Sequence, residues 1–267
     1  MSLVARRFSR AAQTYERGAG LHRHVAARLI ERMPDPDELG TGSILEVGCG
    51  TGVFSEQIRQ RYPQAPLCLL DVSEPMVACV RERWGNAPGL RYVVADVREY
   101  HPDAPFDWVF SSSVLHWATP LDRTFTGLRG MLVPGGGISA AVMIDGTLGE
   151  LHALRRRIAP GKMPGGRLPS REEVVSAMQS SGFSVTTADE ETIQTRYHSA
   201  DDFLCTIHAQ GLTGGPVSRA PAPLSRTELK RLRKEYDVAF RDGASGVFAT
   251  FVVFYFTAKR PMAINGE

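Results

Sequence analysis

The sequence predicts a doubly wound α/β fold with a mostly parallel sheet, and three observations carry that prediction. Short apolar runs of strand length alternate with amphipathic helical segments between residues 44 and 144, as in sheets that helices cover on both faces. A glycine-rich loop at residues 48–52 separates the first run from the helix that follows it. Asp71 and Asp96 end the next two runs. Since ligands of open α/β sheets bind at the carboxyl ends of the strands, these positions predict a ligand site.

Composition and charge exclude several classes of protein. The chain has 267 residues, of which 43% are hydrophobic and 22% charged, as expected for one folded domain and not for a disordered chain. A formal net charge of +2 requires neither nucleic acid nor membrane as a partner. No apolar run approaches the roughly 20 residues that span a bilayer. The four cysteines lack the C-x-x-C spacing of metal sites, so we expect no bound metal and a cytoplasmic location.

The expected elements follow one another in a regular order up to residue 144. Helical periodicity covers residues 1–40 and stops at the proline-containing run 34–37. The alternating core is then expected to have strands at 44–47, 67–70, 90–95, 106–112 and 137–144, and helices at 53–62, 75–84 and 121–132.

The second half of the chain adds a helical insertion before a last strand. Ser170 and Glu173 form a predicted capping box at the start of one helix. The other expected elements are helices at 148–158, 200–209 and 227–240, and strands at 183–188 and 246–258. Within a single domain we therefore expect an N-terminal helical lid (1–40), a ligand-binding core (41–145), and a part that completes the sheet and caps the substrate (146–267).

The glycine loop Glu46-Val47-Gly48-Cys49-Gly50-Thr51-Gly52 favours S-adenosylmethionine as the ligand. Its G-x-G-x-G spacing differs from the G-x-G-x-x-G of dinucleotide folds, and it has no P-loop lysine. S-adenosylmethionine has no phosphate and suits such a loop, whose glycines allow close approach to the backbone. A purely structural turn would produce the same pattern.

The two strand-end aspartates fit the rest of such a cofactor. Asp71 lies roughly 20 residues beyond the loop, where an acidic group can accept hydrogen bonds from both ribose hydroxyls. Asp96 can accept a hydrogen bond from the adenine amino group, while the Val97 backbone N–H can donate one to a ring nitrogen of adenine. Either aspartate could instead cap a helix or a turn, but a loop and two acids at three successive strand ends favour a binding site.

Together these motifs resemble the class I S-adenosylmethionine-dependent methyltransferases over residues 40–145. The fourth strand Phe106-Asp107-Trp108-Val109-Phe110-Ser111 and the turn Leu132-Val133-Pro134-Gly135-Gly136-Gly137 also match. The resemblance implies a Rossmann-like sheet of seven strands, with the last one antiparallel beside the fifth. The residues that it assigns to the cofactor are Glu46, Gly48, Cys49, Gly50, Gly52, Asp71, Val72, Met76, Asp96, Val97 and Ser112.

A narrower resemblance covers nearly the whole chain and concerns the malonyl-acyl carrier protein O-methyltransferases of biotin synthesis. The stretches that resemble this family are residues 8–15, 113–117, 146–151, 167–169, 204–207 and 224–229. The chain departs from the family at His116, where glutamine is common, at His208–Gly211 and at Gly246–Ala249. These departures put the identity of the acceptor in doubt and leave the fold unaffected.

That resemblance implies a reaction in which the free carboxylate of a malonyl thioester attacks the sulfonium methyl. The carboxylate is ionised at neutral pH, so alignment and exclusion of water replace a general base. Tyr15 and His116 are the candidate catalytic residues, although either can be a packing side chain. Tyr15, His116, Trp117 and Arg155 are the candidate acceptor contacts, and Arg155 can equally belong to a solvated helix face.

The expected partner is malonyl-acyl carrier protein or malonyl-coenzyme A, and the sequence does not choose between these thiols. A carrier protein would be acidic and favour a basic patch, but a solvated helix would give the same cluster at Arg226, Lys230, Arg231, Arg233 and Lys234. We expect a monomer that binds neither nucleic acid nor membrane.

Three other functions stay open. They are methylation of another small acceptor, cofactor binding without catalysis, and a dinucleotide-dependent dehydrogenase, against which the glycine spacing argues.

Overall fold

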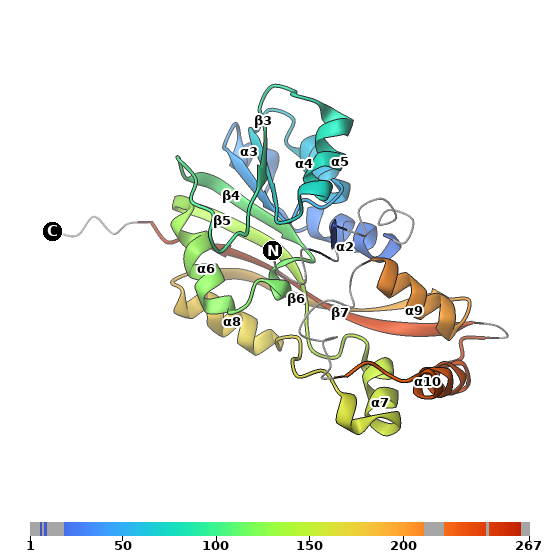
Figure 1. Cartoon of the computed structure of the whole chain (residues 1–267). Coiled ribbons are helices and arrows are strands. Elements are labelled where there is room, and N and C mark those ends of the chain that lie inside the picture. Colours follow the sequence, from blue (N-terminus) through green and yellow to red (C-terminus); the bar gives the residue numbers. More distant parts are fainter. Residues whose placement is uncertain (1–5, 7, 10–18, 211–221, 244–245, 263–267) are drawn as a thin grey trace.

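The computed structural model describes residues 6, 8–9, 19–210, 222–243 and 246–262. One seven-stranded sheet has the order β3-β2-β1-β4-β5-β7-β6 (Figure 1). Strands β1 to β5 run parallel, and β7 is antiparallel to both β5 and β6. This confirms the predicted fold class and the position of the last strand beside the fifth. The strands are β1 Ile44–Val47, β2 Leu67–Asp71, β3 Leu90–Val94, β4 Phe106–Ser112, β5 Leu132–Met143, β6 Ser184–Tyr197 and β7 Val247–Lys259.

Helices lie on both faces of the sheet, and each face has its own apolar core. Buried side chains of α2, α4 and α5 share one core with one side of the strands. Side chains of α6 and α8 share the other core. Alternation along β7 shows the division, because Phe251, Val253 and Tyr255 join the first core while Phe254 and Phe256 join the second. The helices of these layers are α2 Gly20–Ile30, α4 Val53–Arg61, α5 Glu74–Trp84, α6 Leu121–Gly130 and α8 Arg171–Ser180, and short α3 is Pro36–Leu39.

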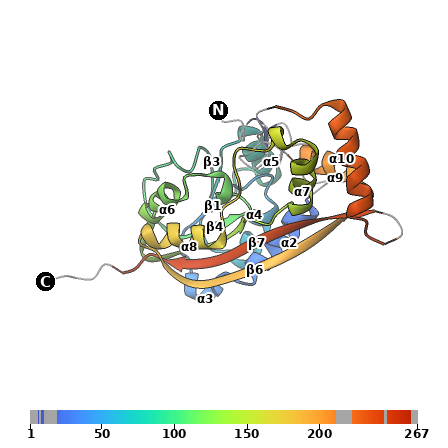
Figure 2. The same ribbon diagram turned by 90° about the horizontal axis from the view of Figure 1, so that it is seen from below.

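Three further helices gather around the far end of the β6–β7 pair. They are α7 Gly149–Ile158, α9 Ala200–Ala209 and α10 Arg226–Ala239, and Figure 2 shows them grouped at one end of the molecule. The described residues also include the short 3-10 helices η2 Leu115–Trp117 and η3 Pro160–Lys162. Ser170 and Ser225 each form a complete capping box, with Glu173 and Glu228. The capping box predicted at Ser170 is therefore confirmed.

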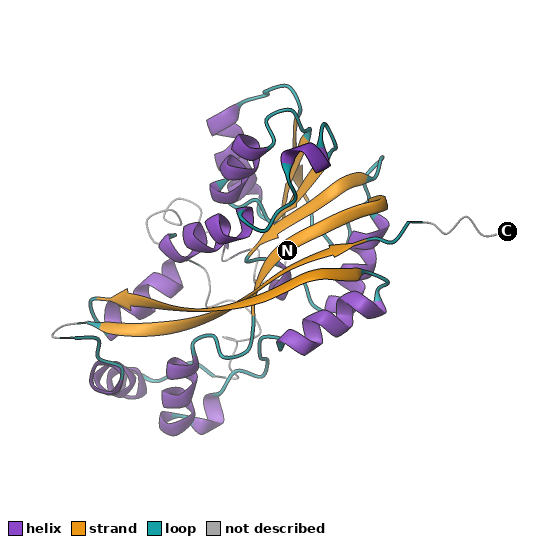
Figure 3. Cartoon of the chain, turned by 180° about the vertical axis from the view of Figure 1, so that it is seen from behind, coloured by secondary structure: helices purple, strands orange, loops and turns teal. Residues whose placement is uncertain are grey.

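The main departure from the expected elements is the length of β6. The strand was predicted to end at Ala188, but it continues to Tyr197 and pairs with β7 along its whole length. Figure 3 shows the two strands extending beyond the rest of the sheet. The added part is rich in polar residues because β6 is an edge strand whose side chains stay largely accessible to solvent. A pattern based on apolar runs therefore misses it.

Candidate active site

The glycine loop joins the end of β1 to the start of α4, as predicted. Gly48, Gly50 and Gly52 have φ of +77°, +53° and +93°, a backbone region that other residues rarely adopt. Gly48 is also crowded, since an added Cβ would lie 2.3 Å from a methyl group of Val114. At Gly50 an added Cβ would meet nothing within 4 Å. The loop backbone thus passes against the segment after β4 at one glycine and leaves open space at another.

We expect Gly48→Ala to destabilise the fold much more than Gly50→Ala. Both changes force a side chain into a left-handed conformation, which costs about 1–2 kcal/mol. Only the change at Gly48 adds an overlap with the stiff Val114 side chain, for a total of about 2–5 kcal/mol. Urea unfolding of the two variants measures the difference. Equal losses would show that the loop moves away from Val114 at little cost.

Asp71 connects the glycine loop to the start of α5. Its carboxylate accepts hydrogen bonds from the backbone N–H of Gly50 at 3.0 Å and of Ser73 at 2.8 Å. Ser73 caps α5 by accepting the N–H of Met76, a buried residue. Burial raises the pKa of Asp71, while these N–H groups oppose the rise. Asp71 and Val72, which follows it, therefore lie beside the glycine loop at the carboxyl ends of the parallel strands.

Asp96 follows β3, and its carboxylate is held by Arg98. The Arg98 Nε donates to Oδ1 at 2.9 Å and Nη2 donates to Oδ2 at 2.5 Å. A third group of Arg98, Nη1, donates to the carbonyl of Thr119 at 2.9 Å. Hydrogen bonding by Arg98 lowers the pKa of Asp96 and keeps the carboxylate ionised. Arg98 was not predicted as a site residue, although the Asp-x-Arg spacing is present in the sequence.

Glu46 is a buried acid at the base of the loop. It is 1% exposed within β1, and among the described residues its Oε2 has no hydrogen-bond partner. Burial, assisted by the negative charge of Asp71, raises the pKa of Glu46 to about 8. Such a group is mostly protonated at pH 7, and a cation placed beside it would favour its ionised form.

His116 and Trp117 follow β4 on the short helix η2. His116 is 4% exposed, and its Nδ1 accepts the backbone N–H of Met143 at 3.3 Å. Burial lowers the pKa of His116 to about 3, and His22 adds to the effect. The ring is therefore neutral and, because Nδ1 accepts, carries its proton on Nε2. The centroids of the Trp117 and His116 rings are 4.8 Å apart, and the rings of Phe8 and Trp117 meet in a T-shaped arrangement with 6.1 Å between centroids.

The low pKa of His116 predicts a specific loss of stability in acid. The folded state holds this ring neutral down to about pH 3, whereas the unfolded chain binds the proton near pH 6.5. Stability is therefore lost as pH falls below 6.5, by about 1.4 kcal/mol per pH unit. We expect His116→Gln to lose less stability than the parent between pH 7 and 4.5 in urea unfolding. Parallel curves would show that His116 does not carry this dependence.

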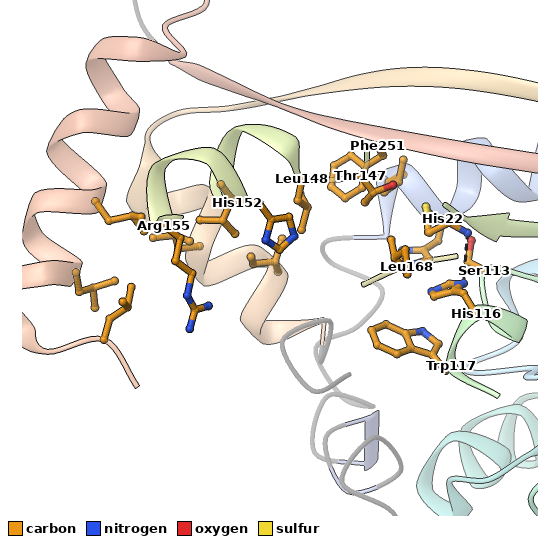
Figure 4. Close-up of a pocket in the computed structure, with 18 residues that line it drawn as sticks. His22, Ser113, His116, Trp117, Thr147, Leu148, His152, Arg155, Leu168 and Phe251 are labelled. Atoms are coloured by element: carbon orange, nitrogen blue, oxygen red, sulfur yellow. Dashed lines mark hydrogen bonds between the residues drawn. The ribbon is translucent and has the colours of Figure 1, made fainter. Parts of the chain in front are cut away.

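A cavity of about 230 Å³ begins at these residues and extends toward α7, α9 and α10 (Figure 4). His116, Trp117 and Ser113 line one part, and Arg155 and His152 of α7 line another. The lining between them is mainly apolar, from Leu148, Leu151, Leu168, Leu204, Ile207 and Phe251. In the part of the chain that the structure describes, Ser113 Oγ, Trp117 Nε1 and His152 Nε2 lack hydrogen-bond partners.

The structure thus brings three predicted acceptor contacts, His116, Trp117 and Arg155, to one cavity. Arg155 is half-buried, donates from Nε to the carbonyl of Lys162 at 3.2 Å, and has its pKa lowered by burial. Tyr15 lies outside the described residues. The polar lining residues that were not predicted as acceptor contacts include His22, Ser113 and His152. The i, i+3 spacing of His152 and Arg155 on one helix was a usable signal, whereas His22 reaches the cavity only through tertiary packing of α2.

The other predicted cofactor residues lie in the loop itself or at the carboxyl ends of strands β3 and β4. Gly52 caps α4, and an added Cβ there would lie 3.2 Å from Val80 of α5. Cys49 and Val97 are buried, and Ser112 is half-buried at the end of β4. Within the described ranges, no helix is long and apolar enough to cross a membrane, and no group of three or more His, Cys, Asp or Glu side chains is arranged to hold a metal.

Comparisons with known proteins agree with this geometry. A family model described as a methyltransferase domain matches residues 44–136. A malonyl-acyl carrier protein O-methyltransferase of Ilyobacter polytropus is 30% identical over 96% of this chain and 97% of its own length. One of Geobacter sulfurreducens is 30% identical, with 96% and 98% covered.

Two solved structures share the fold at low sequence identity. An S-adenosylmethionine-dependent methyltransferase of Mesorhizobium loti has a TM-score of 0.51 at 19% identity, over 88% of this chain and 96% of its own. The YcgJ protein of Bacillus subtilis has a TM-score of 0.61 at 11% identity, with 90% and 99% covered.

Proposed function

Because the chain belongs to the malonyl-acyl carrier protein O-methyltransferase family, we propose that it methylates the free carboxylate of a malonyl thioester, a step of biotin synthesis. It is an S-adenosylmethionine-dependent methyltransferase of class I. One observation carries the choice of acceptor. The described residues that line the cavity include no Asp or Glu. A carboxylate enters such a cavity without like-charge repulsion.

The residues around the glycine loop fit the cofactor. When bound there, S-adenosylmethionine would supply an electrophilic methyl group to the acceptor oxygen, with the thioether as the leaving group. Asp71 would accept hydrogen bonds from the ribose hydroxyls, and Glu46 would face the ammonium group of the cofactor's methionine part. Asp96 and the Val97 backbone N–H would form hydrogen bonds with the adenine ring. The loop glycines, Cys49, Val72, Met76 and Ser112 would form the remaining walls.

The acceptor side needs hydrogen-bond donors and no general base. A malonate-type carboxylate is already ionised at pH 7, and the neutral His116 is a poor proton acceptor because its pKa is about 3. Its Nε2–H, the Trp117 indole N–H and the Ser113 hydroxyl are the available donors at this end of the cavity. Weak neutral donors would orient the carboxylate while leaving it nucleophilic. Arg155 would contact the thioester or the arm that follows it.

The experiment that tests the function is methyl transfer from labelled S-adenosylmethionine to malonyl-carrier protein, with acetyl-carrier protein as the control. We expect label on the malonyl form alone, and release of that label by base as from a methyl ester. Binding of the cofactor without transfer to the malonyl form would contradict the proposed acceptor and direct the search to other small acids, phenols or amines.

We also propose that Tyr15 contacts the acceptor from the predicted N-terminal lid. Of residues 1–40, α2 and α3 contribute buried side chains to the core beside the sheet and so are not part of a lid. Tyr15→Phe is then expected to lower the turnover number by about tenfold while the affinity for the cofactor stays the same, because only an acceptor hydrogen bond is lost. Single-turnover assays and calorimetry separate the two quantities. An equal loss of both would place Tyr15 in the cofactor pocket or in the packing of the fold.

A further inference from the structure

Helices α7 and α10 pack against each other and carry much of the positive charge of the chain. Together they contain eight Arg and Lys residues and four Asp and Glu residues, a net charge of +4, whereas the whole chain has a net charge of +2. The remainder of the protein is therefore slightly acidic. A concentration of charge on two adjacent helices creates a local field that the overall charge conceals.

The four acids of these helices are half-buried, and each is engaged within the protein. Glu150 accepts the N–H of Thr250 at 3.2 Å, and Asp237 accepts the N–H of Ala200 at 2.7 Å. Glu228 pairs with Lys162 at 2.7 Å, and Glu235 pairs with Arg231 at 2.7 Å and with Arg157. Two of these acids, Glu228 and Glu235, are thus neutralised by ion pairs, and the other two, Glu150 and Asp237, are held by hydrogen bonds within the protein.

Three cations of α10, by contrast, form an exposed row. Arg226, Lys230 and Lys234 are spaced at i, i+4 and i+8, so they lie on one face of the helix. All three are exposed, and none has an ion-pair partner in the described ranges. We call this row the α10 stripe. Unpaired charges in a row are available to a partner without breaking an existing ion pair.

The same helix also forms a wall of the acceptor cavity. Leu229 and Leu232 of α10 line the cavity beside Arg155 of α7. On the helical wheel they lie about 100° and about 160° from Lys230, the central residue of the stripe. One side of α10 thus contacts the space for the acceptor, and another side presents the stripe to solvent. A macromolecule bound to the stripe would lie next to the cavity.

We propose that the α10 stripe docks an acidic carrier protein domain, whose thioester-bearing arm enters the cavity beside α10. The inference rests on the proposed function for the identity of the occupant, and on charge complementarity for its place. An acidic domain meets three unpaired cations there, and a flexible arm attached to that domain needs only to pass one helix. Docking on the stripe separates recognition of the carrier from recognition of the acyl group.

The test compares the triple variant Arg226→Glu, Lys230→Glu, Lys234→Glu with the parent enzyme on two substrates. One is malonyl-carrier protein, and the other is malonyl-N-acetylcysteamine, which has the same acyl group and no carrier. We expect KM for the carrier substrate to rise at least about tenfold, with kcat and all constants for the small thioester unchanged. Added salt should raise KM of the parent and have little effect on the variant.

Lys230→Glu and Arg123→Glu form a matched pair, since Arg123 is an exposed arginine of α6 without an ion pair among the described residues. Only the change at Lys230 is expected to weaken binding of the carrier protein. Calorimetry of the binding of unacylated carrier protein gives a measurement that does not depend on turnover. If the parent binds the carrier through the stripe but methylates neither substrate, docking is supported and the proposed function is contradicted. Unchanged carrier affinity in the triple variant, or an equal loss on both substrates, would overturn the docking proposal.

Discussion

Replacing Asp71 by alanine is expected to weaken cofactor binding by about 1–3 kcal/mol, or roughly 5- to 150-fold. The carboxylate holds the backbone N–H groups of Gly50 and Ser73, so its removal leaves two donors without a partner beside the glycine loop. It also removes the proposed acceptor for the ribose hydroxyls. Calorimetric titration with S-adenosylhomocysteine measures the loss directly.

Asp107→Ala provides a matched control for Asp71. This second aspartate also accepts two hydrogen bonds, from the backbone N–H of Ser43 at 2.7 Å and from its hydroxyl at 3.1 Å. It lies at the start of β4. The glycine loop follows the carboxyl end of the parallel strand β1, so the two sites are at opposite ends of the strands. We expect Asp107→Ala to lower the free energy of unfolding without changing cofactor affinity. Unchanged affinity in a folded Asp71→Ala variant would contradict the ribose assignment.

The cofactor half of the fold was predictable from sequence because its signals are local. The strands β1 to β4 are specified by apolar runs, the glycine loop and strand-end acids. Parallel pairing of β1 and β2 then brings Asp71 next to Gly50 at the carboxyl ends of these strands. The polar edge strand β6 lacks an apolar run, so its continuation to Tyr197 became visible only through pairing with β7. A periodic pattern of apolar residues indicates a buried face, and a strand whose side chains are largely exposed has no such pattern.

The acceptor cavity was predictable only in part, for a different physical reason. His116 and Trp117 follow a strand end and were found by position, whereas His22 comes from α2 and meets them across the fold. Arg98 shows the same limit at short range, because its adjacency to Asp96 was visible but not the hydrogen bonds that its side chain makes. A cavity assembled from helices of separate segments depends on packing that no local pattern records.

The affinity for the cofactor is expected to increase with pH through the ionisation of Glu46. Burial raises the pKa of this carboxyl to about 8, so a bound ammonium group that requires the ionised form must displace a proton below that pH. The dissociation constant of S-adenosylhomocysteine should therefore fall by about tenfold per pH unit between pH 6 and 7.5. In the protein without cofactor the sign is opposite: since the folded pKa lies above the unfolded value of 4.5, stability is fully present below pH 4.5 and declines as pH rises toward 8.

Glu46→Gln separates these effects because glutamine resembles the protonated acid in shape and does not titrate. We expect the variant to bind the cofactor with an affinity that is nearly independent of pH from 6 to 7.5, and to lose less stability than the parent toward pH 8 when no cofactor is present. Calorimetry and urea unfolding over one pH series measure both. The two effects depend on one buried proton, whose release by a cationic ligand would couple cofactor binding to pH at the base of the glycine loop. A variant that keeps the tenfold slope would assign that proton to another group and remove Glu46 from the ammonium site.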